Sequence, residues 1–314
     1  MLALDEFSDG KEILAVCAQG GSPVAMGLLR RERPGMWQTF QPSQLPLGAF
    51  LVRPGESLQH IVDDLIRSLP GVGLSFAVTQ QDPDILPRPE ESRTVDTLNY
   101  IDTARLNVVD SFDKYWATRG KNLRHNVKRQ KAKLSEEGIA LRLEVLNRPE
   151  EVLGAIVDYG RLESAGWKAH EGTAVSPDNA QGRFYRKVFE TFCGAGAGTI
   201  YRYSFGDRVV AMDLCLESND AMVILKTTYD ESIKAISPAI LMRHEYFHAI
   251  FDQKRFSRIE FYGKVMEWHL RWTEQVRTLY HANYCRWAWL QQARDSVTWR
   301  GKVRQEEAPK ASFE

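Results

Sequence analysis

The chain has 314 residues, of which 43% are hydrophobic and 26% charged, so it has the composition of a globular protein with one large or two smaller domains. Its 41 Lys and Arg residues balance its 41 Asp and Glu residues. A chain without net charge has no overall field that attracts nucleic acid, so a polyanion must meet a local basic patch. We therefore expect no DNA partner.

The cysteines and the N-terminus indicate the compartment. The four cysteines lie far apart and form no C-x-x-C pair, which argues against a disulfide framework, against a cysteine-rich metal site and for a reducing cytoplasm. The N-terminal residues include early acids and no long apolar core, so we expect no signal peptide. No apolar stretch approaches the ~18 residues of a membrane span. The sequence therefore predicts a soluble cytoplasmic protein, and it carries no signal for an oligomeric state.

The first third of the chain is typical of strands and turns. Short apolar runs at 11–19 and 23–30 flank the turn residues 20–23, which predicts a hairpin. A helix is expected over 57–69, because Ser57 is a good N-cap and apolar residues then recur with the helical period. Strands are expected at 73–79 and 94–101, on either side of a proline-rich loop.

Residues 114–133 form a basic segment. Leu123, Val127 and Leu134 mark the buried side of a helix whose other faces carry positive charge. The segment contains eight cations and no acid: Lys114, Arg119, Lys121, Arg124, Lys128, Arg129, Lys131 and Lys133. Arg124, Lys128 and Lys131 share one face, so their charges repel unless solvent or a bound anion relieves them. The segment is either a solvated helix face or an anion-binding surface.

From residue 139 onward the order of elements is informative. A strand at 139–146 precedes two helices, after Pro149 and over 178–193. Three strands follow at 199–205, 208–216 and 221–229. A helix then begins at Ser237-Pro238 and extends to about 253, and a strand at 258–262, a helix at 267–275 and a strand at 276–286 complete the order β-α-α-β-β-β-α-β-α-β.

Short motifs accompany this order. They are Gly166-Trp167-Lys168, Leu225-Lys226-Thr227-Thr228-Tyr229-Asp230, Ser237-Pro238-Ala239, Ile259-Glu260-Phe261-Tyr262-Gly263, Leu270-Arg271-Trp272, and the basic segment with Trp116, Arg124 and Arg129. Over about residues 112–290, the order and the motifs together resemble the GNAT superfamily of acyl-CoA N-acyltransferases. The branch that they resemble is the FemAB-like one associated with cellulose and exopolysaccharide biosynthesis.

The resemblance implies an α/β fold with a mixed sheet and two GNAT-like halves. The reduced half would span 1–112, a basic connecting helix 113–138 and the complete acyltransferase domain 139–314. It implies acetyl-CoA or another acyl-CoA as donor and an amine as acceptor, on a small molecule, a peptide, an amino sugar or a cell-envelope or polysaccharide precursor. The candidate acceptor-binding residues are Trp167, Lys168, Lys226, Arg124 and Lys128.

Two departures from the family pattern keep other functions open. The usual Ser-Pro-Gly turn ends in Ala239 here, and His269 stands where the family usually has a lysine. A non-catalytic GNAT scaffold is therefore one alternative. Another is a Fem-type transferase that takes an aminoacyl group from tRNA, which the basic segment favours and the absence of net charge and of a coiled-coil arm opposes.

The helix that begins at Ser237 is the candidate cofactor cradle. Free amides at a helix N-terminus bind phosphate oxygens, and Pro238 costs nothing at the first helical position because an amide there has no partner in the helix. Ala239, Ile240 and Leu241 would supply the amides, although an ordinary Ser-capped helix explains the same residues. In this superfamily the two neighbouring strands splay apart to admit the pantetheine arm. Thr228 and Tyr229 would then supply backbone donors for the thioester carbonyl.

Four side chains near this fork are acid–base candidates. Asp213 interrupts the apolar strand at 208–216, and Glu260 and Tyr262 share one face of the strand at 258–262. His269, which stands where the family usually has a lysine, is the fourth candidate. A desolvated carboxylate would take the proton of the amine, and the tyrosine hydroxyl would protonate the thiolate. For each of these residues, a structural, hydrogen-bonded role is the alternative.

A literal H-E-x-x-H sequence at 244–248, followed by Glu267 after eighteen intervening residues, suggests a zinc peptidase as a remote alternative. The intervening strand and Gly263 oppose it, because such enzymes need helical geometry there. We expect no metal.

Overall fold

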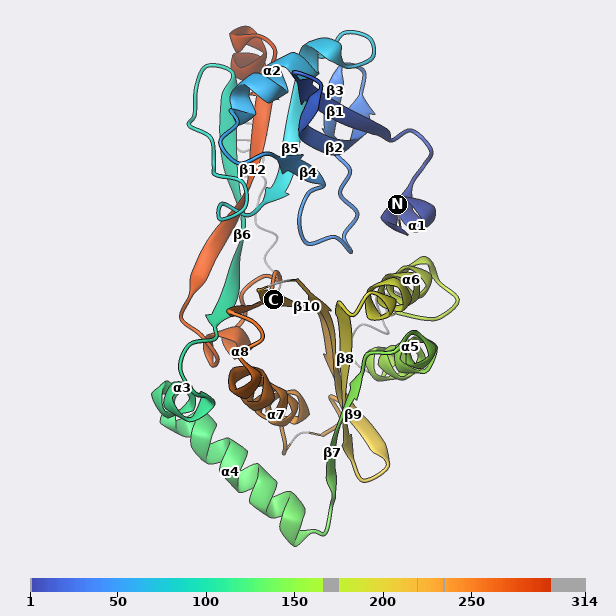
Figure 1. Ribbon diagram of the computed structural model, residues 1–314, viewed down its shortest axis with the longest axis vertical. Coiled ribbons are helices and arrows are strands. Elements are labelled where there is room, and N and C mark those ends of the chain that lie inside the picture. Colours follow the sequence, from blue (N-terminus) through green and yellow to red (C-terminus); the bar gives the residue numbers. More distant parts are fainter. Residues whose placement is uncertain (1, 166–174, 219, 234, 295–314) are drawn as a thin grey trace, which may run out of the picture. The chain divides into compact units, whose positions relative to one another are not determined.

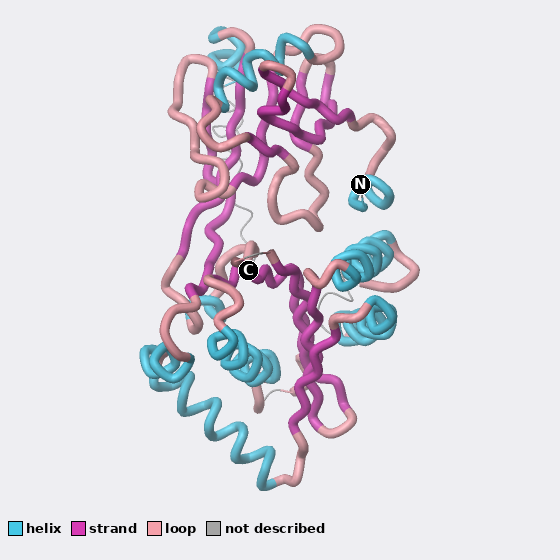
Figure 2. Tube along the Cα trace, in the orientation of Figure 1, coloured by secondary structure: helices cyan, strands magenta, loops and turns pink. Residues whose placement is uncertain are grey.

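The computed structural model describes residues 2–165, 175–218, 220–233 and 235–294 (Figures 1 and 2). Two compact units make up the chain: unit 1 contains residues 1–7 and 102–277, and unit 2 contains residues 8–101 and 278–314. These limits differ from the predicted 1–112, 113–138 and 139–314. The limits differ because two long strands join the sheets of the units. The end of β6 (Val95–Asn107) pairs in the sheet of unit 1, whereas β12 (Val276–Cys285) pairs with a strand of unit 2.

Unit 2 is built on a mixed sheet. Besides β12, it contains β1 (Ile13–Gln19), β2 (Ser22–Arg33), β3 (Met36–Thr39), β4 (Phe50–Val52), helix α2 (Leu58–Ser68) and β5 (Ser75–Gln81). The strand order is β1-β2-β3-β5-β12, with β4 on β2, and β3 and β5 run parallel. The predicted hairpin is confirmed, since Gly20 and Gly21 both take positive φ in the turn between β1 and β2.

Helix α2 closes the core of unit 2. The side chain of Ser57 accepts a hydrogen bond from the amide of His60, which caps the helix as the sequence predicts. Its apolar stripe is buried: Leu58, Ile61, Val62, Leu65 and Ile66.

Unit 1 contains the complete half. Its elements are α1 (Leu2–Phe7), α3 (Phe112–Thr118), α4 (Lys121–Glu136), β7 (Leu141–Leu146), α5 (Pro149–Ser164), α6 (Ala180–Gly194), β8 (Gly198–Phe205), β9 (Arg208–Glu217), β10 (Ala221–Tyr229), α7 (Pro238–Gln253), β11 (Arg258–Glu260) and α8 (Glu267–Leu270). The strand order is β6-β11-β10-β9-β8-β7, in which β10 and β11 run parallel. The predicted mixed α/β fold, with one complete and one reduced half, is confirmed.

The helices of unit 1 cover both faces of its sheet. Helices α5 and α6 lie on one face and α7 on the other (Figure 1). Among the large apolar side chains between the sheet and α7, those of Phe247, Phe251 and Trp272 are fully buried. Within the described ranges, no helix is long and apolar enough to cross a membrane.

Two predicted helices differ from the structure. The basic segment is divided into α3 and α4, because the chain becomes extended at Arg119 and restarts after Gly120. The helix predicted at 267–275 ends at Leu270. Beyond the helix, the hydroxyl of Thr273 donates to the carbonyl of Arg105 in β6 at 2.7 Å.

Candidate active site

A cleft of about 710 Å³ lies within unit 1, where four elements end or begin. Its lining comes from the end of α5 (Leu162, Glu163), the end of β10 (residues 227–229), the loop after β10 (Glu231, Ile233, Ile236), the start of α7 (residues 237–240, Arg243) and the region of α8 (residues 266–268, Arg271). Because α5 and α7 lie on opposite faces of the sheet, the cleft reaches both faces, as an opening between strands would.

The strands β10 and β11 separate at this cleft. They pair over 221–223 and 258–260, and β11 ends there while β10 continues for six more residues. The pairing of β10 with β9 also shifts between Ile224 and Lys226, so Leu225 is an extra, bulged residue. A bulge changes the direction of a strand and re-aims its side chains. The edge of β10 over Thr227, Thr228 and Tyr229 thus borders the cleft beyond the reach of β11.

The N-terminus of α7 forms one wall of the cleft. The amide of Ser237 donates to the side-chain oxygen of Gln130 on α4 at 3.0 Å, and Pro238 is the first residue of the helix. The amides of Ile240 and Leu241 both donate to the carbonyl of Ser237, at 3.0 and 3.1 Å. The Ser237 side chain does not cap the helix.

The predicted set of phosphate-binding amides therefore needs a correction at its last two members, because the amides of Ile240 and Leu241 are both bonded within the helix. Leu241 is fully buried in the core and its amide is bonded within the helix, so it cannot face a ligand. Ser237, Ala239 and Ile240 line the cleft, as do Thr228 and Tyr229. The amide of Ala239 lies in the first turn, where a helix provides no carbonyl partner.

A buried ion pair holds β9 against α7 beside the cleft. Arg243 donates from Nε and Nη2 to the two carboxylate oxygens of Asp213, both at 2.8 Å, and the hydroxyl of Tyr246 donates to the same carboxylate at 2.7 Å. The guanidinium also donates to the hydroxyl of Thr227 on β10 and lies 4.2 Å from the ring centre of Trp268. Asp213 is thus the anchor of Arg243 and does not line the cleft, so we do not assign it the acid–base role that the sequence suggested.

A second buried pair lies on the opposite face of β10. Lys226 Nζ donates to Glu163 Oε1 at 2.6 Å and stands over the rings of Tyr159 and Tyr185, at 5.5 and 5.7 Å from their centres. The other carboxylate oxygen of Glu163 accepts from the amide of Val175 at 2.7 Å. Lys226, proposed from the sequence as an acceptor-binding residue, thereby contacts a cleft-lining carboxylate.

The remaining acid–base candidates lie behind the walls of the cleft. Glu260 is 3% exposed and accepts from Arg258 and Arg277, at 3.1 and 2.8 Å. Tyr262 has a φ of 38°, and the guanidinium of Arg277 lies over its ring, 5.3 Å from the ring centre. Both residues therefore pack around one arginine, and neither lines the cleft.

His269 is buried next to the cleft wall. Its Nδ1 accepts a hydrogen bond from the amide of Met266 at 2.9 Å, and its ring stacks on Trp268 with centres 3.5 Å apart. Burial, and secondarily the charge of Arg243, lowers the pKa of His269 from 6.5 to about 4. A neutral imidazole suits this position, since a lysine would place a second cation beside Arg243.

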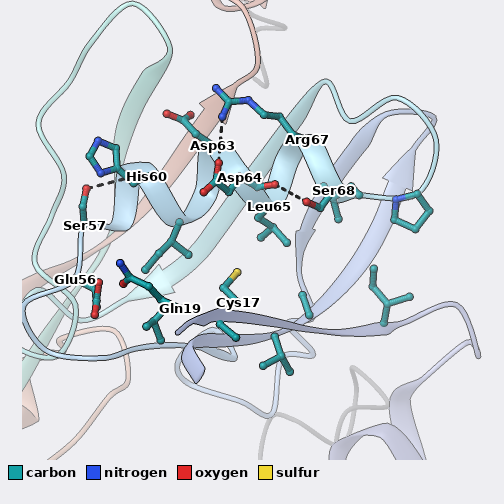
Figure 3. A pocket seen from close by; sticks show the side chains of 18 residues that line it. Cys17, Gln19, Glu56, Ser57, His60, Asp63, Asp64, Leu65, Arg67 and Ser68 are labelled. Atoms are coloured by element: carbon teal, nitrogen blue, oxygen red, sulfur yellow. Dashed lines mark hydrogen bonds and ion pairs between the residues drawn. The ribbon is translucent and has the colours of Figure 1, made fainter. Parts of the chain in front are cut away.

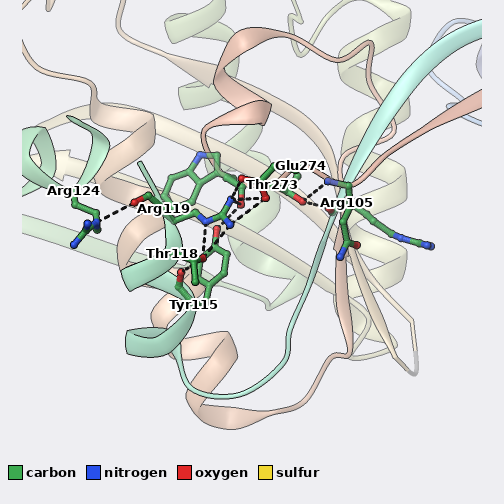
Figure 4. A network of polar contacts seen from close by, with 9 residues as sticks. Arg105, Tyr115, Thr118, Arg119, Arg124, Thr273 and Glu274 are labelled. Carbon is green, nitrogen blue, oxygen red and sulfur yellow. Dashed lines mark hydrogen bonds and ion pairs between the residues drawn. The ribbon is translucent and has the colours of Figure 1, made fainter. Parts of the chain in front are cut away.

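Several basic residues at α3 and α4 have partners within unit 1. Arg119 donates to Glu274 and to the carbonyl of Trp272, and the side chain of Arg124 donates to the carbonyl of Arg119 (Figure 4). Arg124 thereby braces the junction of α3 and α4. Lys128 is exposed.

Lys131, the third member of the predicted cationic face, pairs with Glu245 on α7 at 3.2 Å. An internal acid therefore relieves part of the repulsion that the sequence predicts. The same carboxylate accepts from the hydroxyl of Tyr203 at 2.6 Å.

The H-E-x-x-H residues serve packing. His244 and His248 contact the ring of Phe112 edge-on, and Glu245 is bonded to Lys131 and Tyr203. Burial lowers the pKa of His244 to about 4. Over the described ranges, no three His, Cys, Asp or Glu side chains come close enough to share a metal ion. This arrangement gives the zinc-peptidase alternative no support.

Trp167 and Lys168 lie outside the described residues. Sequence reasoning missed Glu163 and Arg243. A signal for Arg243 exists: it is a cation that directly follows the apolar run at 238–242 in α7, and Asp213 is a single acid inside an apolar strand. Complementary charges within two apolar segments indicate a buried pair.

A second hollow of about 830 Å³ lies in unit 2 between β1 and α2 (Figure 3). Cys17 is on the strand side, and Asp63 and Asp64 are on the helix. These acids pair with neighbours on the same helix, Asp63 with Gln59 and Asp64 with Arg67. The hollow resembles a solvated surface groove, and we assign it no chemistry.

Comparisons with known proteins agree with this geometry. The family model of the acetyltransferase (GNAT) domain matches residues 121–302, which is more than half of the chain. A search of curated proteins finds no match. The fold is similar to the C-terminal domain (DUF2156) of the "Putative Lysylphosphatidylglycerol Synthetase" from Agrobacterium fabrum, with a TM-score of 0.56, 13% identity, and coverage of 90% of this chain and 87% of that one.

Two further structures share the fold at low identity. L-PGS from Bacillus licheniformis has a TM-score of 0.51 and 12% identity, over 88% of this chain and 85% of that one. FemX has a TM-score of 0.52 and 8% identity, over 87% and 88%. The match to the family model, together with the separated strands and the helix N-terminus at the cleft, shows that this chain belongs to the acetyltransferase (GNAT) domain family.

Proposed function

We propose that the protein is an N-acyltransferase that moves an acetyl or other acyl group from acyl-CoA to an amine. The observation that carries the proposal is the cleft in which β10 leaves β11 beside the N-terminus of α7. Within one cavity, this arrangement combines a helix N-terminus that could bind phosphate with a strand edge that β11 does not cover. An acyl-CoA has the complementary parts: a pyrophosphate and an arm of amide groups that ends in a thioester.

The start of α7 would bind the pyrophosphate. The first-turn amide at Ala239 and the positive end of the helix dipole attract phosphate oxygens. The bond from Ser237 to Gln130 fixes the entry into the helix, so the cradle is set before the ligand arrives. The backbone of Thr228 and Tyr229 would pair with the amide arm as a neighbouring strand does, and would polarise the thioester carbonyl.

The two buried pairs would set the geometry of this site. Asp213 holds Arg243, and Arg243 holds Thr227 at the start of the exposed edge of β10. Asp213 is therefore a positioning residue in this proposal. Glu260, Tyr262 and His269 support the far side of the same wall, and we propose for them a structural contribution to the position of α8.

Calorimetric titration with CoA tests the proposal. We expect binding by the wild type, and a loss of at least about tenfold in affinity for Ala239→Asp, because a carboxylate in the cradle repels phosphate. The matched control is Ala180→Asp, which places the same acid at the N-terminus of α6, away from the cleft. Absence of binding at millimolar CoA would contradict the proposal, and equal losses in both variants would show that the effect is not local.

A second candidate is a Fem-type transferase that takes its aminoacyl group from tRNA. The exposed cations of α4, which include Lys121, Lys128 and Arg129, favour it. Filter binding of charged tRNA at increasing salt distinguishes the donors, because phosphate contacts give a steep fall of affinity with salt. Affinity for tRNA above that for CoA, lost on replacing Lys128 and Arg129 with Gln, would favour the tRNA donor.

The third candidate is a GNAT scaffold without turnover, motivated by Ala239 and His269. The structure gives both residues a place that does not block the cleft: Ala239 lines it, and His269 is neutral and stacked behind Trp268. Tight CoA binding without acyl transfer to any amine would support the scaffold.

A further inference from the structure

The cleft contains a carboxylate whose surroundings are built for a cation. Glu163 lines the cleft, yet its side chain is only 1% exposed. The rings of Tyr159 and Tyr185 flank the place where the ammonium of Lys226 stands. A carboxylate with two aromatic faces binds an alkylammonium through charge, hydrogen bonding and cation–π attraction together.

The present occupant of this place comes from the chain itself. Lys226 reaches it from β10, and the next residue, Thr227, contacts Arg243 on the opposite face. Side chains alternate along a strand, so Lys226 must point toward α5 as long as Thr227 points toward α7. Its side chain is 15% exposed, so the ammonium is mostly, and not completely, withdrawn from solvent.

The hydroxyl of Tyr159 gives a second, independent observation. It is fully buried and, among the described residues, has no hydrogen-bond partner. Burial raises the pKa of this hydroxyl well above its usual range, and Glu163 raises it further, so it is a permanent donor. The oxygen of this hydroxyl can also accept a hydrogen bond, and leaving a buried hydroxyl without a partner costs about 1–3 kcal/mol, which an ammonium that donates to this oxygen would recover.

We propose that Glu163, Tyr159 and Tyr185 form an ammonium site at the acceptor end of the cleft. It receives the acceptor amine as a cation, and Lys226 rests in it when no acceptor is present. This inference rests on the proposed acyltransferase function and names its acceptor class, an aliphatic primary amine.

The site also accounts for the protons. An ammonium cannot attack a thioester, so Glu163 takes one proton from it and leaves a neutral amine. The amine nitrogen then forms a bond to the acyl carbon, and the bond from that carbon to sulfur breaks. The second proton of the nitrogen goes to the departing thiolate, which leaves as the thiol. Glu163 finally releases its proton to solvent, so the products are the amide, free CoA and one proton.

Chemical rescue tests the site without knowledge of the natural acceptor. Lys226→Ala removes the resident ammonium, and n-propylammonium has the same atoms beyond Cβ that the substitution removes. We expect n-propylammonium to raise the melting temperature of Lys226→Ala and to leave Lys226→Ala/Glu163→Gln unchanged. The matched control is Lys187→Ala, whose lysine pairs with Glu6 at 2.8 Å away from the cleft and should not respond.

The same variant tests the acceptor role. With acetyl-CoA present, Lys226→Ala should convert n-propylamine to N-propylacetamide, detected by mass spectrometry. The added Glu163→Gln change should slow this reaction by about 100-fold or more, the usual contribution of a general base. 1-Propanol, which carries no charge, should neither stabilise the variant nor be acylated.

Each outcome decides the inference. Stabilisation followed by amide formation supports it. Stabilisation without amide formation, in a protein that binds CoA, shows that the pair is structural only and overturns it, as does the absence of any stabilisation. If the wild type does not bind CoA, the acyltransferase function fails together with the acceptor role, while the melting temperatures still report separately on the ammonium site.

Discussion

The buried pair of Asp213 and Arg243 offers a direct test of how the cleft wall is held. Asp213 is fully buried and accepts three hydrogen bonds, two from Arg243 and one from Tyr246. Asp213→Ala leaves a guanidinium that is 3% exposed without its counter-charge. Removal of one partner from a buried pair costs about 3–5 kcal/mol, so we expect the free energy of unfolding to fall by that amount.

For a unit of this size, the loss corresponds to a decrease of roughly 6–20 °C in the melting temperature. Urea titration of the wild type and the variant measures the free energy directly. The control is Glu190→Ala, which breaks a surface pair with Arg186 and should cost less than about 1 kcal/mol. The double change Asp213→Leu/Arg243→Met should recover much of the stability, because it removes both charges. A loss below about 1 kcal/mol for Asp213→Ala would refute the reasoning.

Three further predictions concern the same region. In the folded protein His269 has a pKa near 4, whereas in the unfolded chain it binds a proton below about pH 6.5. The free energy of unfolding should therefore decrease as the pH falls from 6.5 toward 4. Denaturant titrations should show a smaller decrease for His269→Gln. Gly160→Ala should lower both the melting temperature and any acyl transfer, since its added carbon would lie 2.5 Å from the carbonyl of Val175, whose amide donates to the cleft carboxylate. Gln130→Leu should weaken CoA binding several-fold with little effect on the melting temperature, because it removes the acceptor for the Ser237 amide that precedes α7. Calorimetric titration with CoA measures this change in affinity.

Local patterns were sufficient to predict most of the elements of this fold. Ser57 and the apolar stripe after it predicted α2 to within two residues, and the glycines at 20 and 21 predicted the first hairpin. Such features depend on neighbours in the chain, which a sequence displays. The short strands β3 and β4 were missed because three or four residues carry too little periodicity.

The cleft could be predicted only in part, because its parts meet through tertiary contacts. The N-terminus of α7 was visible as Ser237-Pro238, whereas the separation of β10 from β11 depends on where the pairing stops. Asp213 was identified as an acid in an apolar strand, but its partner Arg243 lies thirty residues later. Glu163 was missed because nothing in the sequence of α5 distinguishes it from a surface glutamate.

The two buried pairs are best explained by the position of the cleft between them. Apolar side chains of similar volume would hold helices to a sheet as well as buried ion pairs do, because desolvation offsets most of the attraction between the charges. An ion pair adds direction: its hydrogen bonds fix two atoms to within a few tenths of an ångström. Asp213 fixes Arg243 on the α7 face of β10, and Glu163 fixes Lys226 on the α5 face, at the consecutive residues 226 and 227 of one strand. Before an acceptor binds, the strand edge that borders the cleft is therefore oriented from both faces at the point where β11 no longer constrains it, which under the proposed function is the point at which the thioester is held.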